Sequence, residues 1–186
     1  SEVPLMVKLP LSSSWASPLE VKEKVSELID VSESVAESIP IILAYASKVA
    51  EVHGHHYTEV IEIDRLFNAA AKELSAHMMK EELILFPYIK HLVISEKEKS
   101  EPKAPHFGSI SSPIKMMEDE HEAVGDIFKK IASLSNNYTP PESACNTFRA
   151  LYDKLNEFEQ DLHKHIHLEN NILHPKALAL SSKLVS

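Results

Sequence analysis

Two copies of the pattern His-x-x-x-Glu carry the residue types of a metal-binding site. They are His77–Glu81 and His165–Glu169, and each lies late in a segment with helical periodicity. Residues four apart on a helix are about 6 Å apart along the axis and about 40° around it, so each pair presents its imidazole and carboxylate on one face. Imidazole nitrogen and carboxylate oxygen suit iron, manganese or zinc, and a carboxylate can bridge two ions. The spacing therefore predicts a metal centre, to which His121 adds a third imidazole.

These five residues are in line with apolar residues that recur every three or four positions. The stripes are Ile63, Leu66, Phe67, Ala70, Leu74, His77, Glu81, Ile84 and Tyr88; Ile114, Met117, His121, Val124, Phe128 and Ile131; and Ala144, Phe148, Leu151, Leu155, Phe158, Leu162, His165, Glu169 and Ile172. An ionised carboxylate in a dry core is costly unless it is paired or bound to metal. No Lys or Arg occupies the stripes. A cation between the two glutamates would remove both the burial cost and their mutual repulsion.

Taken singly, the same residues have simpler interpretations. A lone histidine on an apolar stripe, such as His121, is more often a hydrogen-bonded core residue. One His-x-x-x-Glu pair is common on any acidic helix. Two pairs in register with their stripes, joined by a third inward histidine, favour the metal site. The ferritin-type arrangement uses Glu-x-x-His, a spacing that these stripes lack.

The remaining candidate groups are interpreted as structural or exposed. The run Glu118-Asp119-Glu120 is interpreted as a solvated face, with the alternative that Glu120 orients His121 or shapes access to it, and Cys145 is expected to be a buried or inert thiol with no base nearby. No catalytic residue is assigned. The other histidines are expected at helix ends, in turns and loops or on exposed helix faces: His53, His55, His56, His91, His106, His163, His167 and His174.

Four amphipathic segments position these residues. Helices are expected from Ser17 to a turn at 51–57, from about 59 to 92, from Ser112 to a turn at 136–138, and from a capping box at 139–142 to Pro175. Pro40 should kink or break the first helix, and Pro87 should kink the second. The segment 95–111 predicts a long loop. Four such helices most economically form an all-α, antiparallel four-helix bundle.

Length and composition predict one soluble domain. The 186 residues include 28 Asp and Glu against 19 Lys and Arg, and the formal charge of −9 disfavours nucleic-acid binding. Three glycines and the absence of Gly-rich phosphate loops disfavour nucleotide-binding folds. The single cysteine fits a reducing compartment, and no apolar run is long enough for a membrane span. We therefore expect a cytoplasmic protein with an extended arm at 1–16, the bundle at 17–180 and a tail at 181–186.

Four motifs closely resemble the RIC family, the iron–sulfur cluster repair di-iron proteins with a hemerythrin-like domain. They lie at 75–90 (SAHMMKEELILFPYIK), 113–125, 136–152 and 161–175 (DLHKHIHLENNILHP), and the resemblance covers roughly residues 17–180. It implies a hemerythrin-like bundle with two non-haem iron ions, which an oxo group can bridge. By similarity, His77, His121 and His165 would be terminal ligands, and Glu81 and Glu169 would bridge the irons.

The sequence departs from the family pattern at two places. Family members usually carry a further histidine ligand on the first helix, and Ser32 falls at that position, between Ile29 and Val35 on the inward stripe. A neutral hydroxyl is a poor iron ligand, so one iron would have an open position or bind weakly. Glu33 points about 100° away from Ser32 and is no obvious substitute. Family members also often carry a small N-terminal domain with a Cys-Cys pair, which this sequence does not contain.

The resemblance implies a protein that restores iron–sulfur clusters damaged by nitric oxide or oxidative stress, by supplying iron. Its partners would be the proteins with damaged clusters and the small gases nitric oxide and dioxygen, with no nucleic acid and no membrane. One alternative is a hemerythrin-like module that binds or senses dioxygen or nitric oxide. Another is a degenerate member with a mononuclear iron or zinc site. The sequence leaves the client proteins, the redox partner and the oligomeric state open.

Overall fold

The computed structural model describes residues 18–185; residues 1–17, with the arm expected at 1–16, and Ser186 lie outside the description. The elements are α1 (Pro18–His53), α2 (Glu59–Lys80), the π-helical turn η1 (Glu81–Leu85), α3 (Phe86–Glu98), α4 (Ser111–Leu134), α5 (Asn146–Leu168), the π-helical turn η2 (Glu169–Leu173) and α6 (His174–Val185). No strand occurs between residues 18 and 185, and the predicted all-α, antiparallel bundle is confirmed.

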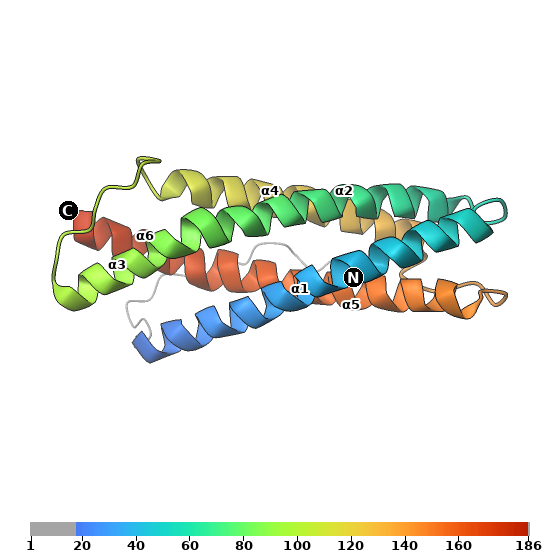
Figure 1. Ribbon diagram of the computed structural model, residues 1–186, viewed down its shortest axis with the longest axis horizontal. Coiled ribbons are helices and arrows are strands. Elements are labelled where there is room, and N and C mark those ends of the chain that lie inside the picture. Colours follow the sequence, from blue (N-terminus) through green and yellow to red (C-terminus); the bar gives the residue numbers. More distant parts are fainter. Residues whose placement is uncertain (1–17, 186) are drawn as a thin grey trace.

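The helices form four long rods that run side by side (Figure 1). α1 packs against α2 and α5, and α2 packs against α4. α2 and α5 each continue through a π-helical turn into a further helix, so that α2–η1–α3 and α5–η2–α6 are two continuous rods. At the end of the molecule where both termini of the described chain lie, α3 packs against α6. Each π-helical turn therefore lies inside a rod, part of the way along the bundle.

Two apolar clusters fill the bundle, one on each side of a polar layer. The first contains residues of α1 from Val35 onward together with residues of α2, α4 and α5, and the second joins the N-terminal part of α1 to η1, α3, the start of α4, the end of α5, η2 and α6. Each of the four rods passes from one cluster to the other over a short stretch: Val31 to Val35, Leu74 to Leu85, Met117 to Val124, and Leu162 to Leu168. Four of the five predicted metal-site residues lie in three of these stretches, Glu169 follows Leu168 directly, and Ser32 lies in the remaining stretch.

α1 is a single helix of 36 residues that continues through Pro40, so the predicted break is wrong. Proline leaves the carbonyl of Ala36 without its helical donor, but Ala36 and Pro40 are both exposed and water can reach that carbonyl. Ile29, placed on the inward stripe, is 44% exposed. The expected turn after α1 occurs at Gly54, where a Cβ would collide with the Ala50 carbonyl oxygen and the Ile61 side chain.

The second and fourth rods differ from the sequence-based helices in length and in register. The second reaches Glu98 instead of 92, and the fourth begins at Asn146 and continues past Pro175 to Val185, through positions assigned to a tail. The predicted inward residue Ile84 is 37% exposed, and Tyr88 is only half-buried. Residues one position later in the chain are buried instead: Leu85, Ile89, Leu173 and His174. A π-helical turn holds one more residue than an α-turn, so it rotates everything that follows it.

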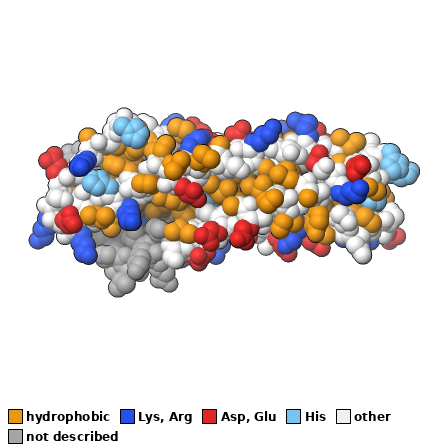
Figure 2. Space-filling view, viewed as in Figure 1, with side chains coloured by type: hydrophobic (Ala, Val, Ile, Leu, Met, Phe, Trp, Pro, Cys, Tyr) orange, Lys and Arg blue, Asp and Glu red, His pale blue; other side chains and the backbone are white. Residues whose placement is uncertain are grey.

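Charged side chains and small groups of hydrophobic side chains alternate on the face shown in Figure 2. The largest exposed fractions among hydrophobic residues are found at Leu83 (71%) and Met79 (60%), next to the π-helical turn of the second rod. None of the helices between residues 18 and 185 combines the length and the apolar character that a membrane span needs.

Candidate metal centre

The structure brings all five predicted ligand residues together in the polar layer of the bundle. Each offers one ligand atom, and these atoms all lie within 4.8 Å of one another. His77 is on α2 and His121 on α4, while His165 lies in the last turn of α5 and Glu81 and Glu169 begin the two π-helical turns. All five are buried, and Glu169 has an exposed fraction of 0%. Three helices thus deliver three imidazoles and two carboxylates to one enclosed space.

The three imidazoles turn their Nε2 atoms toward the carboxylates. Nε2 of His77 lies 3.1 Å from Oε1 of Glu81, and Nε2 of His121 lies 2.9 Å from Oε2 of Glu169. Nε2 of His165 lies 3.4 Å from the same Glu169 oxygen and 3.8 Å from Oε2 of Glu81. Glu169 is therefore central, and each carboxylate is close to more than one imidazole.

Hydrogen-bond partners hold the opposite nitrogens of the rings. Nδ1 of His77 lies 2.9 Å from Oε2 of Glu120, whose other oxygen pairs with the Lys80 ammonium. Nδ1 of His121 lies 3.0 Å from Oδ1 of Asn170. Metal-binding histidines commonly donate their second ring N–H to such a partner, which fixes the tautomer and the ring orientation. The expectation that Glu120 orients His121 is wrong: Glu120 orients His77, because its side chain crosses from α4 to α2.

The side chain of Ser32 reaches the centre from α1, as the inward stripe predicted. Its hydroxyl donates to the carbonyl of Leu28 at 2.8 Å and lies 3.1 Å from Nδ1 of His165. Glu33 and Glu37, the nearby carboxylates of α1, are both exposed. Among its described side chains, α1 therefore contributes to the centre a small neutral group beside His165 and no further imidazole or carboxylate.

Burial and mutual contact shift the proton affinities of these groups strongly. Burial alone would lower the pKa of His77, but the Glu169 and Glu81 carboxylates outweigh it and raise that pKa to about 10. Burial and the adjacent Glu169 raise the pKa of Glu81 to about 9. Glu169 is also buried, but contacts with Glu81, His121 and His165 hold its pKa well below the usual value. Without a cation, the group formed by the two carboxylates and the neighbouring imidazoles therefore retains protons.

The donor set fits a metal cation. Within the described residues, Oε1 of Glu81, both oxygens of Glu169 and Nε2 of His165 are buried without a hydrogen bond of good geometry. Such atoms are costly to bury unless a further group, here a cation, satisfies them. Nε2 of His77 and Nε2 of His121 are 3.0 Å apart. This is close to the separation of two nitrogens on neighbouring positions of one ion with bonds of about 2.1 Å.

His174 is the buried polar residue of this region that sequence reasoning missed. We expected it at a helix end because Pro175 follows, but α6 continues past that proline and His174 is fully buried. Its ring is parallel to that of His121, with the centroids 6.3 Å apart. Burial lowers the pKa of His174 to about 4, so the ring is neutral at pH 7. The signal was available in the repeated spacing His-x-x-x-Glu-x-x-x-Leu-x-Pro, which places His174 where the first copy has Phe86.

The other groups singled out from the sequence lie away from the centre. His163 and His167 are exposed as expected, and His167 contacts Asn171. Cys145 is exposed at the start of α5, and Nε2 of His53 lies 3.1 Å from its sulfur. The expectation that no base is near Cys145 is therefore wrong, because the end of α1 folds against the start of α5.

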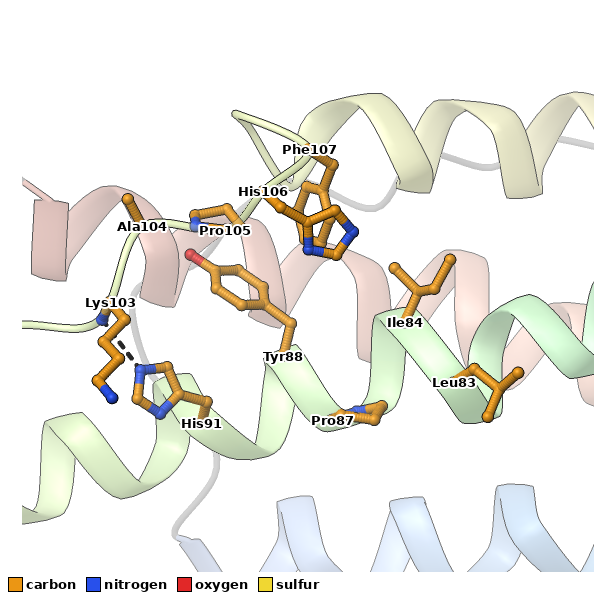
Figure 3. A pocket seen from close by; sticks show the side chains of 10 residues that line it. All are labelled: Leu83, Ile84, Pro87, Tyr88, His91, Lys103, Ala104, Pro105, His106 and Phe107. Carbon is orange, nitrogen blue, oxygen red and sulfur yellow. Dashed lines mark hydrogen bonds between the residues drawn. The ribbon is translucent and has the colours of Figure 1, made fainter.

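A surface pocket lies between the outer face of η1 and α3 and the loop that precedes α4 (Figure 3). Its lining residues are Leu83, Ile84, Pro87, Tyr88, His91, Lys103, Ala104, Pro105, His106 and Phe107. The backbone N–H of Lys103 donates to Nε2 of His91 at 3.0 Å and ties the loop to α3. None of the five residues of the metal centre lines this pocket.

The sequence is similar to known metal-binding proteins over most of its length. The pattern of the hemerythrin HHE cation binding domain matches residues 33–177. Two iron–sulfur cluster repair proteins YtfE, from Yersinia pseudotuberculosis serotype IB (strain PB1/+) and Yersinia pestis (strain Pestoides F), are each 44% identical over 142 residues. These matches cover 76% of this chain and 58% of each relative, so the chain spans little more than half of their length. YtfE of Cronobacter sakazakii (strain ATCC BAA-894) is 36% identical over 181 residues, 96% of this chain and 75% of that relative.

Proposed function

The chain belongs to the hemerythrin HHE cation-binding domain family and, within it, to the RIC family, and from this premise we propose that it holds a non-haem di-iron centre used in iron–sulfur cluster repair. One observation carries the proposal: three Nε2 atoms converge on two buried carboxylates whose oxygens lack adequate hydrogen bonds within the described chain. A pair of cations satisfies all of these atoms at once. The donor set of nitrogen and carboxylate oxygen is one that iron accepts.

Each residue has a distinct part in holding the two ions. His77 and His121, with Nε2 atoms 3.0 Å apart, would bind one iron, and His165 would bind the other. Glu81 and Glu169 each lie close to imidazoles of both groups and would bridge the irons. Bound iron supplies a change of oxidation state and exchangeable coordination positions. Glu81 and Glu169 would hold the iron through carboxylate oxygens, a type of ligand that would tolerate a change of oxidation state and the release of an ion.

The repair activity proposed for this chain is the supply of iron to damaged clusters. The relatives that it matches are named as iron–sulfur cluster repair proteins. Its partners would be proteins whose clusters nitric oxide or oxidants have damaged, and nitric oxide and dioxygen would reach the centre as small gases. We further propose that it works in the cytoplasm, without nucleic acid or membrane. The exposed Met79 and Leu83 lie next to the π-helical turn of Glu81 and would form part of the surface that a client meets.

Metal analysis together with the optical spectrum of freshly purified protein tests the centre. We expect two irons per chain and an absorption spectrum typical of bridged ferric iron. One iron per chain, or zinc, would contradict the di-iron proposal and favour the mononuclear alternative. Glu169→Gln is the informative variant, because it removes a carboxylate that is close to all three imidazoles, and it should lose at least one iron.

Transfer of iron to an apo iron–sulfur protein tests the repair proposal. The iron-loaded chain should restore the cluster in the presence of sulfide and reductant, and an iron chelator too large to enter the bundle should not suppress the transfer. The Glu169→Gln variant at equal protein concentration is the control for free iron. Restoration at the same rate by both proteins would mean that the centre is not the donor.

A second candidate function is the reversible binding or sensing of dioxygen or nitric oxide. Ser32 favours it, because the α1 position beside His165 carries a hydroxyl, a poor iron ligand that would leave a coordination position for an exogenous ligand. Gas titration followed by metal analysis separates the two functions. Reversible spectral changes without loss of iron would favour the sensor, and loss of iron to a client would favour the donor.

A further inference from the structure

His174 is buried in a way that packing alone does not explain. Its exposed fraction is 0%, and both ring nitrogens lack a hydrogen-bond partner within the described chain. A neutral imidazole carries one N–H donor and one acceptor nitrogen, and burial of either without a partner is costly. A group that satisfies these nitrogens is therefore expected next to His174.

The position of His174 in the rod places it at the edge of the metal centre. It follows the π-helical turn that begins at Glu169, and its backbone N–H donates to the Glu169 carbonyl. Its ring is parallel to that of His121 within 5°, with the centroids 6.3 Å apart. His174 borders the centre from the side of α6.

The other rod shows what this position needs for packing alone. Its π-helical turn begins at Glu81, and Phe86 occupies the place that His174 has in the second copy of the motif. The backbone N–H of Phe86 donates to the Glu81 carbonyl, as that of His174 does to Glu169. Phe86 packs against the second apolar cluster with no polar atom in its ring. An aromatic ring without nitrogen therefore suits the fold at this position, and the imidazole of His174 serves another purpose.

The centre also lacks an imidazole on the opposite side. Ser32 occupies the α1 position next to His165, and its hydroxyl already donates to the Leu28 carbonyl. Compared with the family pattern, the described chain thus has one imidazole fewer on α1, and it has a buried imidazole on α6. We propose that His174 binds metal as a fourth imidazole of this centre and reaches it from α6, beside His121. The inference rests on the proposed metal centre, and it adds a residue and a direction of approach to it.

Cobalt(II) loading followed by proton NMR tests the assignment directly. Each imidazole bound to cobalt(II) gives its own strongly shifted, exchangeable N–H resonance, so the resonances count the bound histidines. We expect four in the unmodified chain, from His77, His121, His165 and His174. His174→Phe should give three and should weaken cobalt binding at least tenfold. His167→Phe is the matched control, because His167 lies on the same rod and is exposed, and it should keep four.

A second variant tests whether the loss comes from the imidazole itself. His174→Gln keeps a polar side chain and separates loss of the ligand from a packing defect, and it should also give three resonances. The circular dichroism spectrum reports whether each variant folds.

The outcomes distinguish this inference from the proposed function. Three resonances in the unmodified chain, unchanged in His174→Phe, would overturn the role of His174 while the metal centre stands. Three resonances in both proteins are also what we expect if His174 only donates a hydrogen bond to a ligand of the metal, and in that case too His174 does not bind metal. Failure of the unmodified chain to bind cobalt(II) at all would overturn the metal centre and this inference together.

Discussion

Removal of the Glu120 carboxylate should weaken metal binding although Glu120 is not itself a ligand. Its Oε2 lies 2.9 Å from Nδ1 of His77, and its other oxygen pairs with Lys80. These contacts fix the His77 ring so that Nε2 faces Glu81, and they make the imidazole more basic toward a cation. The perturbations are Glu120→Gln, which keeps one acceptor oxygen, and Glu120→Ala, which keeps none.

The structure sets the expected size of the effect. Loss of such an outer partner typically costs 10–100-fold in metal affinity, which is about 1.4–2.7 kcal/mol. The Glu120 side chain is 21% exposed, so water can replace part of the contact, and a glutamine oxygen can still accept from Nδ1. We therefore expect about a tenfold loss for Glu120→Gln and a loss nearer a hundredfold for Glu120→Ala.

Competition with a chromophoric chelator measures the affinity, and Glu118→Gln provides the matched control. Glu118 lies on the same helix two residues earlier and is exposed, so its replacement removes the same charge without touching His77. Glu118→Gln should leave the affinity within about twofold of the unmodified chain. Equal losses in Glu118→Gln and Glu120→Gln would refute the reasoning, because they would reduce the effect to overall charge.

Three further predictions test the centre and its support. Ser32→His alone should raise metal affinity because the hydroxyl lies beside His165, whereas Ser32→Ala, which removes the hydroxyl next to Nδ1 of His165, should lower it slightly; equal affinities in both would mean that α1 does not face the ions. In the metal-free protein, folding raises the pKa of His77 from 6.5 to about 10 and the pKa of Glu81 from 4.5 to about 9. The folded state therefore binds more protons than the unfolded state between pH 6.5 and 9. The urea midpoint should therefore fall as the pH rises through that window, and Glu81→Gln should flatten the fall. Phe67→Ala should lower the free energy of unfolding, measured by urea denaturation, by about 3–5 kcal/mol because Phe67 is 0% exposed. Ile61 is 53% exposed, so Ile61→Ala should change this free energy by less than about 0.5 kcal/mol.

The sequence predicted best where a helix has no interruption. In α4 all six residues of the proposed stripe, from Ile114 to Ile131, are buried. Its period of 3.6 is maintained from end to end, so one face stays inward. The same holds in α2 as far as Glu81, and in α5 from Phe148 to Glu169. The metal-site residues lie at or before the ends of these regular stretches, which is why their inward orientation could be predicted from periodicity.

Prediction failed where side-chain contacts between rods decide the outcome. The contact of Glu120 with His77, and that of His53 with Cys145, join residues more than forty positions apart. Periodicity gives the face of each residue, but it does not say which neighbouring helix a long side chain will meet. The packing of α1 against α5 and of α4 against α2 supplies that information.

The two π-helical turns explain the largest remaining discrepancy, and the prolines that follow them supply a physical cause. Pro87 and Pro175 each lie two residues after the end of a turn that begins at a glutamate of the centre. A proline inside a helix has no N–H to donate, and its ring crowds the carbonyl four residues earlier. A wider turn relieves that crowding, and the helix continues with one extra residue instead of ending. We expected the prolines to kink or end the helices, and they instead accompany a shift in register. That shift carries Leu85 and Leu173 into the core and gives His174 its place beside the metal centre. The repeated spacing His-x-x-x-Glu-x-x-x-Leu-x-Pro therefore encodes both the ligand pair and the change of register directly after it.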